Sequence, residues 1–355
     1  MFRELVYSLS PLTAWLFFGV CLLAILFTGA RLSRYGDVIS TRTGLGRVWV
    51  GLILLAGVSS APELVTGLSA ILVVGEPDLA VGAALGSCVY NLVIIAVLDF
   101  MYRPGTIYSG IRHGHSLSAG FGVILLGTAA AAIFIQHQGE APIGLGPIGP
   151  YTIAAPVIYL IAMRSVFFFE REENRVAMAA ELAEISGPRA KLATLTTGRI
   201  WFFFAVNALM LVVAATALPV IGEALAVTMG WEETFVGTVF LALVTSVPEV
   251  VISVEAVRIG AVDLAIGGIL GSNLFDLLIL AIEDLVYLDG PLLGAVGGEH
   301  VLTAVAALMM TGIAIVGLCS RPTAKVFRAV GWASLGLLTV GLLSALILYL
   351  LGVNT

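Results

Sequence analysis

Two acidic residues lie in the middle of long apolar stretches, and each follows a proline directly. Residues 59–63 read Ser-Ser-Ala-Pro-Glu and residues 245–249 read Thr-Ser-Val-Pro-Glu, which places Glu63 and Glu249 in a duplicated motif. An ionisable group at membrane depth is costly, so such a residue is by default a candidate for function. Two of them on duplicated segments predict a cation site between two halves of the chain.

A second block of similarity follows each motif. Residues 78–96 match residues 263–281 at ten of 19 positions, with Asn91 and Asp276 in equivalent places. The serine four residues before each of them shares its helix face, so all four side chains can look toward the two glutamates. The predicted ligands, which supply hydroxyl, amide and carboxylate groups from both repeats, are Ser59, Ser60, Glu63, Ser87, Asn91, Thr245, Ser246, Glu249, Ser272 and Asp276.

The two prolines are expected to make oxygen atoms available beside the glutamates. Pro62 and Pro248 lack an N–H and clash with the carbonyl four residues earlier, which frees the carbonyls of Val58 and Val244. Carbonyl, hydroxyl and carboxylate oxygens suit Ca²⁺ or Na⁺, and no Cys or His beside the motifs favours zinc or copper. Two neighbouring carboxylates would each take a cation or a proton. One Ca²⁺ and several monovalent ions would then exclude one another from a single site.

Structural interpretations compete with several of these roles. A single proline in a membrane helix is often only a kink, and glycines spaced four apart in the second blocks are explained equally well by close helix packing. Hydroxyl groups in membrane helices most often bond to their own backbone, and Asp276 could form only a structural bond to Asn91. Asp78 and Asp263 match in the repeats, but each follows a turn, so they are expected to cap helices.

Three further residues have expected structural roles outside the site. Glu255 is three residues from Arg258 near the end of an apolar stretch, which predicts a surface ion pair. His113 and His115 fall in a connection between apolar stretches and are expected to be solvated.

The composition indicates a membrane protein with many spans. The 355 residues are 59% hydrophobic and 11% charged, whereas soluble proteins carry about 25% charged residues. Backbone polar groups in lipid must be satisfied internally, so the apolar stretches are expected to be helices. The three cysteines have no Cys-x-x-Cys spacing, which disfavours a disulfide framework or a zinc site. The ten predicted spans are 12–30, 48–74, 78–98, 117–136, 151–169, 200–222, 234–257, 262–283, 300–318 and 328–351.

The basic residues support this count of ten. If connections alternate between two sides, 16 of the 17 Lys and Arg residues fall on one side, and Arg3 alone falls on the other. The positive-inside rule then predicts a protein of the cell (inner) membrane with cytoplasmic basic loops and both termini outside. The first span is expected to be retained and not cleaved as a signal peptide. The net charge of −6 predicts no nucleic-acid partner.

The chain is expected to divide into two halves. Residues 1–169 would form a first five-helix half with a repeat at 57–96, and residues 200–355 a second half with a repeat at 243–281. Residues 170–199 would form a cytoplasmic linker. An odd number of spans in each half places the second half upside down relative to the first. The predicted fold is therefore an all-α polytopic membrane protein with ten transmembrane helices as two inverted five-helix repeats.

These motifs resemble the cation/calcium exchanger superfamily, and most closely its prokaryotic sodium/calcium exchangers. The family's first block is typically Gly-Thr/Asn-Ser-x-Pro-Glu and its second Gly-Ser-Asn-x-Phe-Asn/Asp. The second repeat departs from this pattern at Val244, and the first repeat at Val58, Ser59, Cys88 and Tyr90. The resemblance implies an antiporter that exchanges Na⁺ for Ca²⁺ by alternating access. The first and sixth spans would slide against a core of eight helices.

The resemblance also implies roles for the predicted ligands. Glu63 and Glu249 would hold Ca²⁺ together with the backbone carbonyls of Ser59 and Thr245. The Ser and Asn/Asp positions would complete the Na⁺ sites, with protonation of Asp276 as the alternative to its binding an ion. No prosthetic group is expected. The implied partners are the transported Ca²⁺ and Na⁺ (or H⁺) and the lipid bilayer, and the chain is expected to function as a monomer.

Two other functions stay open on the residues alone. Proton-coupled Ca²⁺ exchange is the main alternative, because clustered carboxylates also carry protons. A channel-like or sensory cation-binding membrane protein is a third possibility, against which the inverted repeat argues. The sequence contains no His-Glu-x-x-His, Gly-x-Ser-x-Gly or comparable constellation, so an enzyme is not expected.

Overall fold

The computed structural model describes residues 10–138, 144, 146, 148–181, 195–229, 244–326 and 329–352. These residues form helices and connections, and the described part of the chain contains no β-strand. Nine of its helices are long and apolar enough to cross a membrane. They correspond to nine of the ten predicted spans. The remaining span, expected at 234–257, begins in residues outside the described part and ends in a described helix, α13.

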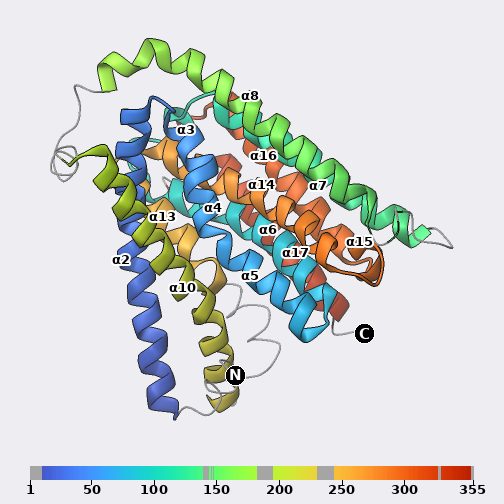
Figure 1. The fold of residues 1–355 in the computed structure, drawn as a ribbon. Helices are drawn as coiled ribbons and strands as arrows, with labels where there is room; N and C mark the ends of the chain where they lie inside the picture. Colours follow the sequence, from blue (N-terminus) through green and yellow to red (C-terminus); the bar gives the residue numbers. More distant parts are fainter. Residues whose placement is uncertain are drawn as a thin grey trace.

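The helices of the first half run from α2 to α8, and those of the second half from α10 to α17 (Figure 1). The first half contains α2 (Pro11–Thr43), α3 (Arg47–Val50), η1 (Gly51–Leu55), α4 (Ala56–Ser59), α5 (Ala61–Ser69), η2 (Ala70–Val74), α6 (Pro77–Met101), η3 (Ile107–Gly110), α7 (Gly114–Gln138) and α8 (Pro150–Glu181). The second contains α10 (Thr197–Met229), α13 (Val247–Arg258), α14 (Val262–Val286), α15 (Leu292–Ala295), α16 (His300–Ser320) and α17 (Trp332–Gly352). Helix α8 continues twelve residues past the predicted end of its span at residue 169, so the linker begins as helix.

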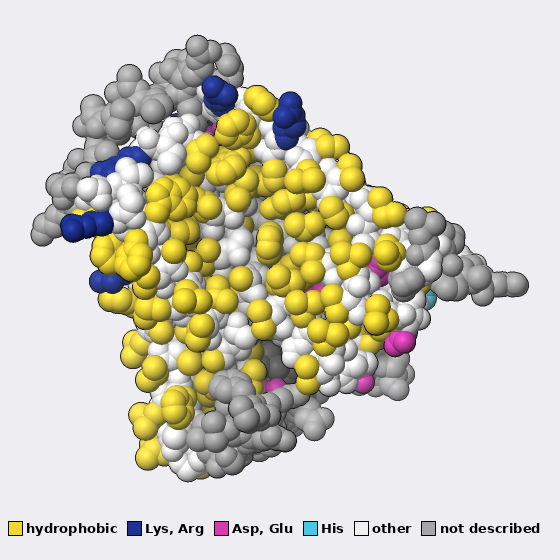
Figure 2. Space-filling model, in the orientation of Figure 1, with side chains coloured by type: hydrophobic (Ala, Val, Ile, Leu, Met, Phe, Trp, Pro, Cys, Tyr) yellow, Lys and Arg dark blue, Asp and Glu magenta, His cyan; other side chains and the backbone are white. Residues whose placement is uncertain are grey.

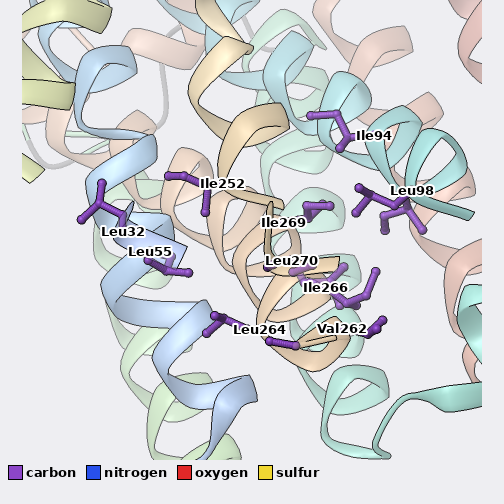
Figure 3. Close-up of a cluster of buried hydrophobic side chains, with 14 of the residues drawn as sticks. Leu32, Leu55, Ile94, Leu98, Ile252, Val262, Leu264, Ile266, Ile269 and Leu270 are labelled. Atoms are coloured by element: carbon purple, nitrogen blue, oxygen red, sulfur yellow. The ribbon is translucent and has the colours of Figure 1, made fainter. Parts of the chain in front are cut away.

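Helix α14 lies at the centre of the fold and is the most buried of the nine candidate spans. Its first half contributes Leu264, Ile266, Ile269 and Leu270 to a large apolar cluster, which includes Ile252 of α13 (Figure 3). Its second half contributes to a different apolar cluster, with side chains of α7, α8 and α16. Helix α6 likewise contributes to both clusters: its first half packs in the cluster of α7, α8 and α16, and its second half packs in the cluster that includes Ile252. The polar residues of both second blocks lie where the two clusters meet.

Helices α2 and α10 pack along each other at one side of the molecule (Figure 1). Near their far ends a separate small apolar cluster joins only these two helices. At the other end, α2 is tied to α13: the Ser33 hydroxyl donates to the Ile252 carbonyl at 2.6 Å, and Arg34 pairs with Glu255 at 2.6 Å. The expected Glu255–Arg258 surface pair is therefore wrong. Glu255 is buried and bonds to another helix because α2 brings Arg34 beside it.

The two predicted helix breaks are present and nearly identical. Ser60 (φ −89°, ψ 2°) and Ser246 (φ −83°, ψ 2°) interrupt the helix at equivalent positions. Pro62 and Pro248 are then the second residues of α5 and α13, where a missing N–H costs little because first-turn N–H groups have no acceptor within the helix. Each proline therefore begins a new helix. In the first half, π-helical turns at η1 and η2 add irregularity that the sequence did not indicate.

Contacts at the helix ends repeat with an offset of 185 residues. Asp99, near the end of α6, accepts hydrogen bonds from the Ile107 and Gly331 N–H groups and the Ser334 hydroxyl. Asp284, 185 residues later in α14, accepts equivalent bonds from the Leu292 and Gly149 N–H groups and the Thr152 hydroxyl. Each carboxylate thus binds the N-terminus of the fifth helix of the opposite half, α17 or α8. This reciprocity is the signature of two interlocked, inverted repeats.

The starts of α6 and α14 show a second reciprocal pair, which corrects two expectations. Asp78 accepts from the Gly297 N–H and binds His300 Nε2 at 3.1 Å, and Asp263 accepts from the Arg112 N–H and binds His115 Nε2 at 2.9 Å. The two aspartates are therefore not helix caps, because they lie inside the first turn and reach across to another helix. His115 is fully buried, not solvated, because α7 begins with its side chain turned toward Asp263.

The surface is divided by chemistry in the way expected of a membrane protein. Large apolar side chains are exposed along α2, α8, α10 and α17, and they cover most of the face in Figure 2. On that face the Lys and Arg side chains gather at the upper left, and most Asp and Glu side chains lie toward the right and bottom. We call these the basic end and the acidic end of the bundle. Helix α6 begins at the acidic end, where Asp78, two residues after Glu76, meets the connection that contains Glu299. Helix α14 begins at the basic end, where Asp263 meets Arg112, and Arg321 binds the neighbouring Ile111 carbonyl.

Candidate functional site

Glu63 and Glu249 lie in the first turns of α5 and α13, directly after the two helix breaks. Both side chains are buried, at 8% and 4% exposure. The first turn of a helix carries exposed N–H groups and the positive end of the helix dipole, which favours a nearby carboxylate. From this point α5 runs toward the acidic end and α13 toward the basic end. The two half-helices therefore present the same kind of terminus to the centre from opposite directions.

The second blocks meet each other beside these glutamates. Helices α6 and α14 cross so that the Asn91 amide donates to the Asp276 carboxyl group at 3.3 Å. One turn away, the Asn273 amide donates to the Cys88 carbonyl at 3.2 Å. Both pairs join residues 185 positions apart, so the crossing lies on the pseudo-symmetry axis of the repeats. Asn91 and Asp276 are almost fully buried.

The two serines at the break of the first repeat, Ser59 and Ser60, contact both α13 and α14 of the second repeat. The Ser59 hydroxyl lies 3.2 Å from the Ser272 hydroxyl and also contacts the Glu249 carboxyl group. The Ser60 side chain faces Asp276. The structure therefore brings Ser59, Ser60, Glu249, Ser272 and Asp276 into one buried cluster.

Several buried oxygen atoms of this cluster have no hydrogen-bond partner. They are the Ser60 hydroxyl, Oε2 of Glu63 and of Glu249, and Oδ1 of Asp276. Buried polar atoms in folded proteins are nearly always paired, so each exception calls for an explanation. Four unpaired oxygens that converge from two repeats fit a site for cations. They are hard ligands of the kind that Ca²⁺ and Na⁺ accept.

The charges of the cluster lead to the same conclusion. Glu63, Glu249 and Asp276 interact electrostatically with one another. The helices that supply the site residues, α4, α5, α6, α13 and α14, contain a single basic residue, Arg258, at the far end of α13, nine residues after Glu249. Burying three carboxylates without a positive partner is expensive. Either cations or protons must therefore neutralise the cluster.

The remaining predicted ligands are placed less uniformly. Ser246 is buried at the second break, and Thr245, beside it, is half-buried and makes interactions of its own. Ser87 is only half-buried, whereas its equivalent Ser272 is almost fully buried. The two halves of the cluster are thus similar and not identical.

Two residues near the site, Asn273 and Glu283, were not predicted as part of it. Asn273 crosses to Cys88 and leaves its own side-chain oxygen without a partner in the core. Glu283, two turns beyond Asp276 in α14, is a further buried acid. The available sequence signal for Asn273 was its position in the second block of similarity. Glu283 gave no such signal, because the equivalent residue of the first repeat is the apolar Leu98.

Two inverted halves that share one buried carboxylate cluster define the class of secondary transporters built from inverted repeats. A family model described as "Sodium/calcium exchanger protein" matches residues 13–161 and 199–351. The chain therefore belongs to the sodium/calcium exchanger protein family, a family of cation/calcium exchangers, as the resemblance predicted. It is a multi-pass membrane protein.

Two curated relatives share most of their length with the chain. "Inner membrane protein YrbG" of Escherichia coli (strain K12) is 28% identical over 273 residues, covering 76% of this chain and 77% of the relative. "Putative antiporter CaxA" of Alkalimonas amylolytica is 25% identical over 304 residues, covering 84% and 88%.

Solved structures of the sodium-calcium exchanger NCX_Mj have the same fold. The form soaked with 10 mM Na⁺ and zero Ca²⁺ superposes with a TM-score of 0.70 at 14% identity, covering 94% of this chain and 98% of that one. The form soaked with 2.5 mM Na⁺ and 0.1 mM Sr²⁺ gives 0.69 at 15% identity with the same coverage. This likeness concerns the fold. It confirms the predicted all-α architecture of ten transmembrane helices in two inverted five-helix repeats.

Proposed function

We propose that the protein is an antiporter that exchanges Na⁺ for Ca²⁺ across the membrane. The observation that carries the proposal is the central cluster, in which three buried carboxyl groups and the Ser60 hydroxyl have unpaired oxygens. The one basic residue on the helices that supply them is Arg258, at the opposite end of α13 from Glu249. The family supports exchange of cations, and NCX_Mj, a structural neighbour, is called a sodium-calcium exchanger.

Glu63 and Glu249 hold Ca²⁺ in this proposal, with the backbone carbonyls of Ser59 and Thr245 as further ligands. Two carboxylates balance the charge of one Ca²⁺ or of two Na⁺, so the two cations compete for one charge-balanced site. The additional side chains that complete Na⁺ coordination are Ser60, Ser87, Asn91, Ser246, Ser272 and Asp276. Asp276 differs from the glutamates because it pairs with its repeat equivalent, Asn91, whose amide donates to one carboxyl oxygen. Its other oxygen, Oδ1, is left for a proton or for Na⁺.

Alternating access would come from α2 and α10 sliding together along the other helices. Their mutual packing and their separate apolar cluster support movement as a pair. The Ser33 and Arg34 contacts with α13 tie the pair to the core at the basic end. Sliding would break these contacts in one state of the transport cycle and form them again in the other.

The same proposal includes an orientation and an oligomeric state. Basic loops would face the cytoplasm, in line with the distribution of Lys and Arg. A monomer would suffice, because one chain supplies both repeats and all the proposed ligands. The proposed unit of function is the chain with its halves at 1–169 and 200–355, joined by residues 170–199.

Proton-coupled Ca²⁺ exchange is the second candidate. The observation that favours it is the same charge deficit, since three buried acids can be neutralised by protons as well as by cations. It differs from the first in its driving ion, so transport measurements separate the two.

Uptake of radiolabelled Ca²⁺ into proteoliposomes tests the proposal. Liposomes loaded with Na⁺ and diluted into Na⁺-free medium should accumulate Ca²⁺, and liposomes loaded with K⁺ and given a pH gradient should not. Glu249→Gln should nearly abolish uptake, whereas Glu76→Gln, at an exposed glutamate of the acidic end, should not. Uptake driven by the pH gradient without Na⁺ would replace the proposal with the proton-coupled alternative.

A further inference from the structure

One further buried acid, Glu283, lies in α14 outside the central cluster. It is 1% exposed, and neither of its carboxyl oxygens has a hydrogen-bond partner. It follows Asp276 by seven residues, which is two helical turns or about 10 Å toward the acidic end. Its neighbour Asp284 is buried as well but accepts three hydrogen bonds. Glu283 therefore differs from an ordinary structural acid of the same helix.

The Glu283 carboxyl group points at α5. A Cβ atom added at Gly67 would overlap Oε1 of Glu283, so only glycine leaves room for the carboxyl group there. Gly67 follows Glu63 by four residues, and residues four apart share a helix face. The face of α5 that holds Glu63 at the centre thus meets Glu283 one turn nearer the acidic end. Glu283 lies between the central cluster and that end of the bundle.

No basic side chain is available to neutralise Glu283 on the nearby elements. Helices α5, η2, α6 and α7, which pack against α14, contain no Lys or Arg. Helix α8 also packs against α14, but its first basic residue, Arg164, lies 14 residues beyond the helix start that Asp284 binds. The other titratable side chains that the structure describes on α5, α6, α7, α8 and α14, and directly after α14, are Glu63, Asp78, Cys88, Tyr90, Asp99, His115, His137, Tyr151, Tyr159, Arg164, Glu170, Arg171, Asp263, Asp276, Asp284 and Tyr287. Of these, Asp276 interacts electrostatically with Glu283. An isolated buried carboxylate costs several kcal/mol even after relaxation of the protein. The group must therefore be neutralised by a bound ion.

The ion that fits is a proton. A Ca²⁺ ion takes six to eight oxygen ligands, and Glu283 offers one carboxyl group beside a glycine. The nearest hydroxyl of α5, that of Thr66, already donates to the Pro62 carbonyl. The repeat-equivalent residue, Leu98, is fully buried and apolar, so packing in this fold does not call for an acid.

We propose that Glu283 is a proton-binding site on the route between the central cluster and the acidic end. It is protonated when it is shielded from water, as its 1% exposure shows it to be in this structure, and it releases its proton when the acidic end opens to water or when cations occupy the centre. Opening toward the acidic end then depends on pH. The role in transport rests on the proposed exchange, but the proton site itself does not.

Infrared spectroscopy of the purified protein tests the site without any transport. At neutral pH the wild type should show the carbonyl band of a protonated carboxylic acid that is absent from Glu283→Gln. Glu76→Gln should leave this band unchanged, because its carboxyl group is exposed to water. Glu283→Leu, which installs the residue found in the other repeat, provides a second variant and should lack the same band. A band that is unchanged in both Glu283 variants would overturn the proposal.

The pH profile of exchange tests the coupling. In the wild type, Ca²⁺ exchange started from the acidic end should rise with pH, by at most about tenfold per unit because one proton is released. In Glu283→Gln and Glu283→Leu the rise should be lost. A wild-type profile in both variants would show that the proton is not coupled to exchange. A wild type that carries the infrared band but exchanges no Ca²⁺ would overturn the proposed function and leave the proton site intact.

Discussion

Asn91 and Asp276 occupy equivalent positions, yet one is an amide and the other an acid. Their side chains meet across the pseudo-symmetry axis at 3.3 Å. Two acids in these places would repel each other, and two amides would remove a charge from the cluster. The mixed pair allows a direct hydrogen bond and keeps the third carboxyl group in the centre. The difference between the repeats therefore has a physical role at the axis, where identical residues would face each other.

Replacing Asp276 by Asn tests the role of this charge. Asp276→Asn keeps the size of the side chain and can keep a hydrogen bond to Asn91, but it removes the acid. If Asp276 serves Na⁺ coupling, the Na⁺ concentration for half-maximal exchange should rise roughly tenfold, equivalent to ~1.4 kcal/mol. The Ca²⁺ concentration for half-maximal exchange should change much less. A larger shift for Ca²⁺ than for Na⁺ would assign Asp276 to the Ca²⁺ site.

At the scale of single residues, the sequence predicted the acids of the centre better than their neighbours. Glu63, Glu249 and Asp276 stand out because a charge in an apolar stretch is rare. The contacts of Glu255 and His115 were predicted wrongly, because a partner from a distant helix cannot be read from local spacing. His115 and His300 are nevertheless 185 residues apart, as are Asp78 and Asp263. That shared offset was the available signal.

Glycines of α14 allow a close approach between helices in the site region. A Cβ atom at Gly267 would lie 2.7 Å from the Val48 carbonyl oxygen, and one at Gly271 would lie 2.6 Å from the Leu52 Cα. These contacts bring α14 against the π-helical segment before the first break. The equivalent Gly86 on α6 has no other atom within 4 Å of such a Cβ. In the second repeat these glycines therefore serve the close packing of helices.

This asymmetry gives a matched test of helix packing. Gly271→Ala should lower the free energy of unfolding by about 1–3 kcal/mol or more, because the added methyl group meets backbone that cannot rotate away. Gly86→Ala, at the equivalent position of the other repeat, should leave stability nearly unchanged. Thermal unfolding of the two variants in detergent measures the difference. Equal midpoints would contradict the close approach of α14 to Leu52.

Helix positions and breaks could be predicted because apolar length and proline are local signals. The two prolines identified the breaks at Ser60 and Ser246, and hydropathy located nine of the spans in the described residues. The π-helical turns η1 and η2 could not be predicted. They depend on how the backbone fits against α14, and the sequence of apolar residues there is compatible with an ordinary α-helix.

The whole molecule is two interlocked halves joined at the ends of their long helices. The pairs formed by Asp78, Asp99, Asp263 and Asp284 connect each half to the other, so neither half would close its own helix ends alone. The inverted arrangement was predictable from the odd number of spans in each half. The reciprocal contacts of Asp99 and Asp284 with helix N-termini were not predicted, because the N–H groups that they bind belong to backbone and have no residue type of their own.

Cysteine labelling tests the proposed orientation of the molecule. The free thiol of Cys319 is exposed at the end of α16 nearest the basic end. If that end is cytoplasmic, a membrane-impermeant maleimide should modify Cys319 in inverted membrane vesicles and not in intact cells. Glu299→Cys, introduced at the acidic end in a Cys319→Ser background, should show the reverse pattern. Labelling of both positions from the same side would contradict the orientation.

The central claim is that one buried carboxylate cluster binds the transported cation. Equilibrium binding of radiolabelled Ca²⁺ to the purified protein, with and without competing Na⁺, measures it directly. The account predicts saturable binding in the wild type that Na⁺ displaces. It predicts a loss of affinity in Glu63→Gln and in Glu249→Gln of at least the 10- to 100-fold that is typical of changing even an outer-shell partner. Binding of wild-type strength in both variants would contradict the account.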